Sequence, residues 1–196
     1  MTTDHRKLPR RRGEALHDAI YQATLDELAE VGYAKLTMEG VARRAKASKA
    51  SLYRRWPSRM ELAVEAVYHA LPDPASLPDT GSLRGDVLAT LRQGAELFAG
   101  PAGEAMRGLL SDALRDESRT AELRRYSQGN GRRSMREITR RAVERGEIDA
   151  EAVTPRRLDV ALAMLRQQFL FNGLPIPDEV IVEIVDEVIV PLFRSR

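Results

Sequence analysis

Residues 37–62, TMEGVARRAKASKASLYRRWPSRMEL, contain two short helical patterns separated by a tight turn. Thr37 precedes the first pattern and Ser48 the second, and a hydroxyl at that place is typical of a helix N-cap. Pro57 ends or deflects the second helix. The predicted inner positions are small or aliphatic: Val41, Ala42, Ala45, Ala47 and Leu52. Two short helices joined in this way form a helix-turn-helix, whose second helix is sized to enter a DNA major groove.

The outer positions of this unit carry hydroxyl, basic and aromatic side chains. They are Ser48, Lys49, Ser51, Tyr53, Arg54, Arg55 and Arg59. Hydroxyl and guanidinium groups bond phosphate oxygens, and Lys or Arg donates to guanine in the major groove. No acidic residue lies between Val41 and Met60. The alternative is an ordinary helical hairpin with a solvated charged face, but the cap spacing and the missing acids favour DNA.

Helical periodicity extends on both sides of this unit. One apolar stripe runs from Gly13 to Val31 with Gly32 as a C-terminal cap, and Ser58 caps a helix that reaches Leu71. A segment rich in proline, 72–82, then separates these helices from further patterns. Those patterns lie at 83–99, 102–115, 117–145, 155–172 and 178–193, and the third contains Gly129-Asn130-Gly131, which predicts a kink or break.

We therefore predict an all-α protein of about nine helices. Its parts are a basic N-terminal arm (1–12), a helix-turn-helix DNA-binding domain (13–71), a linker (72–82) and a C-terminal helical domain (83–196).

Composition narrows the possible functions. The chain has 196 residues, 43% of them hydrophobic, and no cysteine, which excludes disulfides, thiolate metal sites and thiol catalysis. Residues 1–70 carry 13 Lys and Arg against 9 Asp and Glu, whereas residues 71–196 carry 18 against 20. The basic excess is N-terminal, which suits a polyanionic partner, although basic arms also occur as plain solubility tails. No apolar run approaches the roughly 20 residues of a membrane span, and no secretory signal begins the chain, so we expect a cytoplasmic protein that does not bind membranes.

Residues 37–62, together with GEALHDAIYQATLDELAEVGYAKL before them, resemble the helix-turn-helix region of tetracycline-repressor (TetR) family regulators. The resemblance covers residues 13 to about 70. It implies that Lys49, Ala50 and Tyr53 face the bases, and that Arg54 contacts bases or phosphates. The phosphate contacts that it implies are Thr37, Ser51, Arg55 and Arg59.

Two positions depart from the family pattern. The family usually has glycine where Lys46 stands, and a positive φ at Lys46 would strain the turn. Trp56 stands where phenylalanine is common, and we interpret it as a core anchor rather than a base-stacking residue.

The last two long helical patterns predict a homodimer. Both are apolar over more than half their circumference, so each must bury a second side, most simply against another subunit. The predicted interface residues are Leu158, Leu162, Leu165, Phe169, Ile181, Ile184, Val188 and Ile189. TetR-like proteins similarly pair their last two long helices, and a two-fold dimer reads a palindromic operator. The alternative is that both helices are central in a monomeric core.

A small-molecule effector is implied by the resemblance alone. TetR-like proteins hold it among the C-terminal helices. By this resemblance we expect a repressor released by a small hydrophobic compound, with an activator as the alternative. The tentative lining residues are Leu97, Phe98, Met106, Leu110, Tyr126, Met164, Gln168, Phe169 and Asn172. Ordinary core packing is the alternative for each of them.

Two other function classes compete. A small helical enzyme is disfavoured because His5, His17 and His69 lack metal-ligand spacing and no nucleotide-binding or nucleophile motif is present. We therefore predict no metal, no cofactor and no catalytic residue. A non-specific architectural DNA-binding protein would use the basic arm and the arginines between residues 124 and 141 without reading sequence.

Overall fold

The computed structural model describes residues 14–70, 76–114 and 117–194, and within these ranges it is helical and contains no strand. The helices are α1 (Glu14–Lys35), α2 (Met38–Arg44), α3 (Lys49–Tyr53), α4 (Arg59–His69), α5 (Leu83–Ala99), α6 (Pro101–Ala113), α7 (Glu117–Glu144) and α8 (Pro155–Phe171), with a short 3-10 turn η3 (Ala150–Ala152) before α8. A last helical segment joins α9 (Asp178–Glu183), a π-helical stretch η4 (Ile184–Ile189) and α10 (Val190–Arg194). The all-α prediction is confirmed, while the predicted arm lies outside the described residues.

Three predicted caps begin the helices of the N-terminal part. The side-chain oxygens of Thr37, Ser48 and Ser58 accept the backbone N–H three residues further on, at 3.0, 3.2 and 3.1 Å. Each cap residue is extended and satisfies one of the free donors at a helix start. The boundaries of α2, α3 and α4 therefore follow from local chemistry.

Three helix boundaries differ from the sequence prediction. Gly32 has the positive φ of a cap (73°), but one more helical turn follows it and α1 ends at Lys35. The recognition-helix candidate α3 ends at Tyr53, whereas the sequence predicted an end at Trp56. The sequence predicted a kink or break at 129–131; a break is wrong, because α7 is helical through these residues. The long helix on both sides outweighs the helix cost of two glycines, which is about 1 kcal/mol each.

The last pattern is helical, as predicted, but it is not a uniform α-helix. Pro191 has no N–H to donate to the carbonyl of Glu187, and the π-helical stretch Ile184–Ile189 ends two residues before it. The wider turn accommodates the proline within a continuous helical segment.

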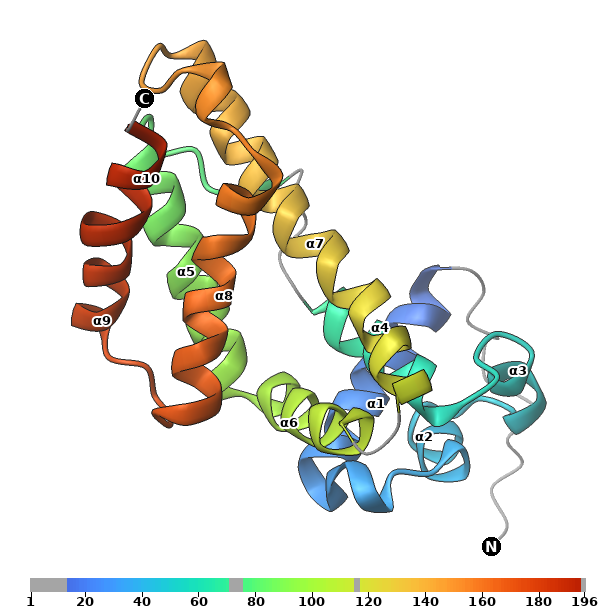
Figure 1. Cartoon of the computed structure of the whole chain (residues 1–196). Helices are drawn as coiled ribbons and strands as arrows, with labels where there is room; N and C mark the ends of the chain where they lie inside the picture. The colour runs from blue at the N-terminus through green and yellow to red at the C-terminus, as the bar shows by residue number, and fades with distance from the viewer. Residues whose placement is uncertain (1–13, 71–75, 115–116, 195–196) are drawn as a thin grey trace, which may run out of the picture.

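The N-terminal helices form a head that packs on a body made of α5 to α10 (Figure 1). Helix α1 packs against α4 and α6, and α4 also contacts α7. Gly108 of α6 allows the close approach, because a Cβ there would lie 2.4 Å from the Tyr33 Cβ of α1. One buried apolar cluster extends from Ile20 to Phe193 through both parts. The predicted domain division at 72–82 stays a prediction, and residues 72–75 lie outside the described part.

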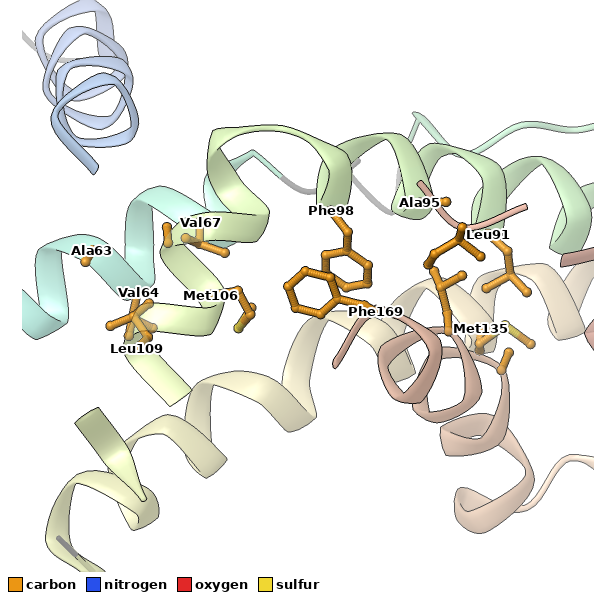
Figure 2. Packing of buried hydrophobic residues seen from close by; sticks show 14 of the residues in the cluster. Ala63, Val64, Val67, Leu91, Ala95, Phe98, Met106, Leu109, Met135 and Phe169 are labelled. Carbon is orange, nitrogen blue, oxygen red and sulfur yellow. The ribbon is translucent and has the colours of Figure 1, made fainter. Parts of the chain in front are cut away.

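The body is centred on two stacked rings. Phe98 of α5 and Phe169 of α8 lie 4.4 Å apart between ring centroids at an interplanar angle of 18°. Figure 2 shows Met106 of α6 beside these rings, on the side towards Val67 of α4. The Arg107 guanidinium covers the Phe169 ring at 4.8 Å. Among the described residues, none of the helices is long and apolar enough to span a membrane.

Candidate DNA interface

Helix α3 has one buried side and one exposed side. Leu52 is fully buried and anchors the helix to the head. Lys49, Ala50 and Tyr53 are exposed on the other side, with Tyr53 at 44%. The spacing of Lys49 and Tyr53, one helical turn apart, brings their side chains together. The surface that sequence analysis identified is therefore accessible to a partner.

Lys49 has two neighbours on this surface. Its ammonium forms an ion pair with the carboxylate of Glu39 on α2 and lies 5.6 Å from the centroid of the Tyr53 ring. The hydrogen bond between them raises the pKa of Lys49 and lowers the pKa of Glu39. Both side chains are exposed, so water screens the pair and it contributes little to stability.

The other predicted contacts on α3 differ in how they are held. Arg55 Nη1 donates to Ser51 Oγ at 2.6 Å and to the Ser51 carbonyl at 3.3 Å, so these two side chains are ordered together. Arg54 is exposed, and its side chain forms no hydrogen bond or ion pair with the described residues. Thr37 and Ser48 accept the capping N–H groups, which leaves each hydroxyl hydrogen to donate elsewhere.

Arg59 joins α4 to the end of α1. Its Nη1 donates to the carbonyls of Ala34 and Leu36, at 3.2 and 3.0 Å. The guanidinium also lies 5.1 Å from the Tyr33 ring centroid. Sequence analysis assigned Arg59 to phosphate binding alone, but the side chain also holds the head together.

The turn between α2 and α3 is strained, as predicted from the lysine at position 46, where the family usually has glycine. Lys46 is the non-glycine residue with positive φ, 52°, in the described chain. The Ala47 N–H bonds the Ala42 carbonyl at 2.9 Å, and the Lys46 N–H bonds the Arg43 carbonyl at 3.2 Å. This closure is a Schellman motif, in which the left-handed position normally holds glycine.

Trp56 follows α3 by three residues and is only 2% exposed. Its interpretation as a core anchor is confirmed. Its indole ring packs against His17 and Tyr21 of α1. The aromatic contact of Trp56 with α1 thus fixes the orientation of α3 on its buried side.

Most of the predicted dimer residues face the subunit's own core. Leu158, Leu165, Phe169, Ile181, Ile184 and Ile189 are buried in the subunit's own core, and Leu162 and Val188 are half-buried. A fully buried side chain cannot contact a second copy, so six of the eight assignments need correction. The exposed side of α8 carries Val160, Ala163, Met164, Gln167, Leu170 and Phe171, with Leu170 37% and Phe171 77% exposed.

The predicted pocket residues differ in how deeply they are buried. Phe98, Met106 and Phe169 are packed in the core, Leu97, Leu110, Met164 and Gln168 are half-buried, and Asn172 is exposed. The side chain of Tyr126 lies outside the described residues. Two grooves of about 310 and 250 Å³ do occur, one along α7 and η3 and one between α5 and residues 175–181. Neither is lined by a predicted pocket residue.

Sequence analysis missed one neighbour of the recognition surface. Glu39 is the single acidic residue between Thr37 and Met60, among seven Lys and Arg residues. That isolation was a usable signal, but its proximity to Lys49 depends on how α2 and α3 pack.

Comparison with known proteins agrees with this geometry. Residues 20–66 match the family described as bacterial regulatory proteins, tetR family, and residues 77–188 match the tetracyclin repressor-like C-terminal domain. An HTH-type transcriptional regulator of Mycobacterium tuberculosis is 33% identical over 180 residues, covering 90% of this chain and 87% of the relative. The DNA-binding transcriptional repressor TetR of Mycobacteroides abscessus is 32% identical over 93% of this chain and 96% of its own length.

Solved structures give the same result. The crystal structure of the TetR family transcription regulator SCO0332 superposes with a TM-score of 0.75 at 29% identity, over 90% of this chain and 97% of that one. Salmonella enterica GusR, at 15% identity and a TM-score of 0.61, shares the fold. These relatives and families are transcriptional regulators and not enzymes. The chain belongs to the TetR family of bacterial transcriptional regulators.

Proposed function

We propose that this regulator is a repressor that binds a palindromic operator as a homodimer and is released by a small hydrophobic effector. The observation that carries the DNA assignment is the exposed side of α3, where Lys49, Ala50 and Tyr53 lie together while Leu52 anchors the helix. An α-helix presented in this way enters the major groove, whose base edges differ for every base pair. We assign the protein to the cytoplasm, where an operator is accessible.

We propose that the contacts divide into two kinds. Lys49, Ala50 and Tyr53 read bases, and Arg54, which is exposed, reaches a base or a phosphate. The phosphate contacts are Thr37, Ser48, Ser51, Arg55 and Arg59. The order of Ser51 and Arg55 supports this division, because a guanidinium already fixed by its neighbour loses less entropy on binding phosphate.

For the dimer we propose the exposed side of α8 in place of the predicted buried residues. Val160, Ala163, Met164, Gln167 and Phe171 recur at helical spacing, which forms a continuous stripe that is mostly apolar. Leu170 adds a further partly exposed apolar side chain. Such a stripe next to the last helical segment suits a helix–helix interface with a second copy, and the two-fold axis would then pair the two heads for a palindrome.

The effector proposal rests on similarity to the family, and the structure supports a hydrophobic compound. The stacked Phe98 and Phe169 rings and Met106 form an apolar centre, which a compound would enter by displacing side chains. Methionine adapts its shape at low cost, so Met106 is the side chain that we expect to move.

Selection from a random duplex pool, followed by competition with bulk DNA at rising salt, tests this function. A sequence-reading regulator retains its preference for one palindrome as salt rises, whereas an architectural DNA-binding protein shows a steep salt dependence and no preferred site. Lys49→Ala should relax the preference at one base position, by about 1–3 kcal/mol. A pool that shows no enriched sequence would contradict the proposal.

A further inference from the structure

The charge distribution of the helix-turn-helix contains one exception. Residues 37–60 carry seven Lys and Arg residues and a single carboxylate, Glu39. This carboxylate does not pair with a nearby arginine of its own helix. It contacts Lys49, the first residue of α3, ten positions along the chain. The one acid of residues 37–60 is therefore paired with a cation on the surface that we propose for base reading.

This pairing restricts where the Lys49 ammonium can lie. A free lysine side chain samples many rotamers, and ordering it on DNA has an entropic cost. Here the carboxylate of α2 and the Tyr53 ring, 5.6 Å from the ammonium, hold it over the exposed side of α3. The ammonium has three donors, and one carboxylate leaves donors for a further acceptor. The Lys49 ammonium is thus positioned and still has donors for a further hydrogen bond.

We infer that Glu39 is a positioning residue that makes Lys49 select a base rather than a phosphate, an inference that rests on the proposed function. To neutralise a phosphate beside α3, the ammonium must leave Glu39, and an unpaired carboxylate then faces the polyanion. A guanine acceptor in front of α3 takes a free donor while the ion pair persists. Glu39 therefore weakens binding to bulk DNA more than binding to the operator.

The same geometry predicts the salt dependence. With Glu39 in place, Lys49 contributes little to phosphate neutralisation on bulk DNA. When the carboxylate is removed, Lys49 becomes one more counterion-releasing cation, which steepens the slope of log K against log salt by about 0.9. Two opposite unit charges about 4 Å apart in water attract each other enough to change an affinity about fivefold.

The test compares Glu39→Gln with the wild type on a duplex selected from a random pool and on bulk genomic DNA. We expect affinity for bulk DNA to rise about fivefold and its salt slope to steepen by about 0.9, while operator affinity does not rise. The ratio of specific to bulk binding then falls about fivefold. Glutamine keeps the size and the helix propensity of position 39, so the thermal midpoint should stay nearly constant.

Two further variants separate positioning from plain charge. Glu151→Gln makes the same charge change in η3, far from α3 (Figure 1), and should alter neither the ratio nor the slope. In a Lys49→Ala background, Glu39→Gln should no longer steepen the slope. The inference is overturned if the ratio and slope are unchanged in Glu39→Gln, or if the same changes persist without Lys49. A wild type with no preferred duplex would instead refute the proposed function, and the inference with it.

Discussion

The Trp56 indole Nε1–H donates a 2.6 Å hydrogen bond to Glu65 Oε2, which connects the end of the α3 turn to the middle of α4. The Tyr21 hydroxyl of α1 donates to the same oxygen at 3.1 Å. One carboxylate oxygen thus joins three segments of the head. Since α4 also packs on α6 and α7 of the body, Glu65 lies on the physical path between the body and the recognition helix.

Glu65→Gln should destabilise the head by about 1–2 kcal/mol. The substitution removes the charge that strengthens the bonds from Trp56 and Tyr21, while a carbonyl oxygen remains to accept one of them. Denaturant unfolding followed by fluorescence measures this directly, because Trp56 is the single tryptophan of the chain. Unchanged unfolding and an unchanged emission maximum in the variant would contradict the role assigned to Glu65.

Tyr21 makes the free energy of unfolding decrease as the pH becomes alkaline. Burial, followed by the neighbouring Glu65 carboxylate, raises the pKa of Tyr21 from 10.0 to about 12. The folded state holds the proton more tightly than the unfolded state, so this contribution is complete below pH 10 and is lost as the pH rises towards 12. Tyr21→Phe has no hydroxyl to ionise. The difference in unfolding free energy between wild type and variant should therefore shrink across this window, and a constant difference would show that Tyr21 does not titrate there.

Lys46→Gly should stabilise the protein by about 1 kcal/mol. The left-handed conformation at φ 52° costs a side-chain-bearing residue about 1–2 kcal/mol, and part of that gain is offset by the larger freedom of glycine in the unfolded chain. Lys46→Ala is the matched control, because it removes the same charge but keeps the strained Cβ. Thermal unfolding should rank glycine above alanine, and equal midpoints would mean that the turn stores no strain.

Arg59→Ala should affect both stability and DNA affinity, whereas Arg54→Ala should affect DNA affinity alone. Arg59 donates to two carbonyls at the end of α1, and its loss leaves them without that donor, at a cost of about 1 kcal/mol. The Arg54→Ala substitution removes the same charge from an exposed position. Binding assays combined with thermal unfolding distinguish the two, and a stable Arg59→Ala protein would contradict the contact with α1.

Phe171→Glu should convert the proposed dimer to a monomer without unfolding the subunit. Phe171 is 77% exposed on α8, and a carboxylate there would be buried without a partner in the proposed interface. Leu114→Glu is the control, since Leu114 is 76% exposed and lies at the end of α6. Sedimentation equilibrium should show a monomer for the first variant and a dimer for the second. A dimer in both would exclude this side of α8.

Truncation before Asp178 is a poorer test of the dimer. The segment that it removes contributes Ile181, Val185 and Phe193 to the subunit's own core, so the shortened chain would lose folding stability as well as any interface.

The pattern of correct and incorrect predictions has a physical basis. The caps at Thr37, Ser48 and Ser58 were predictable because the side-chain oxygen and the N–H that it accepts are three residues apart. The strain at Lys46 was predictable for the same local reason. The dimer residues were misassigned because periodicity identifies the apolar side of a helix and is blind to which neighbour covers it.

What the sequence by itself determined is the helical order, the helix-turn-helix and the basic head, since each depends on residues within a few positions of one another. Only the tertiary structure decided which side of α8 is exposed, that Phe98 and Phe169 close the centre of the body, and that Glu39 contacts Lys49. These relationships join residues that are distant along the chain. They depend on how whole helices pack, because burial and ion pairing are properties of the three-dimensional neighbourhood and not of local spacing.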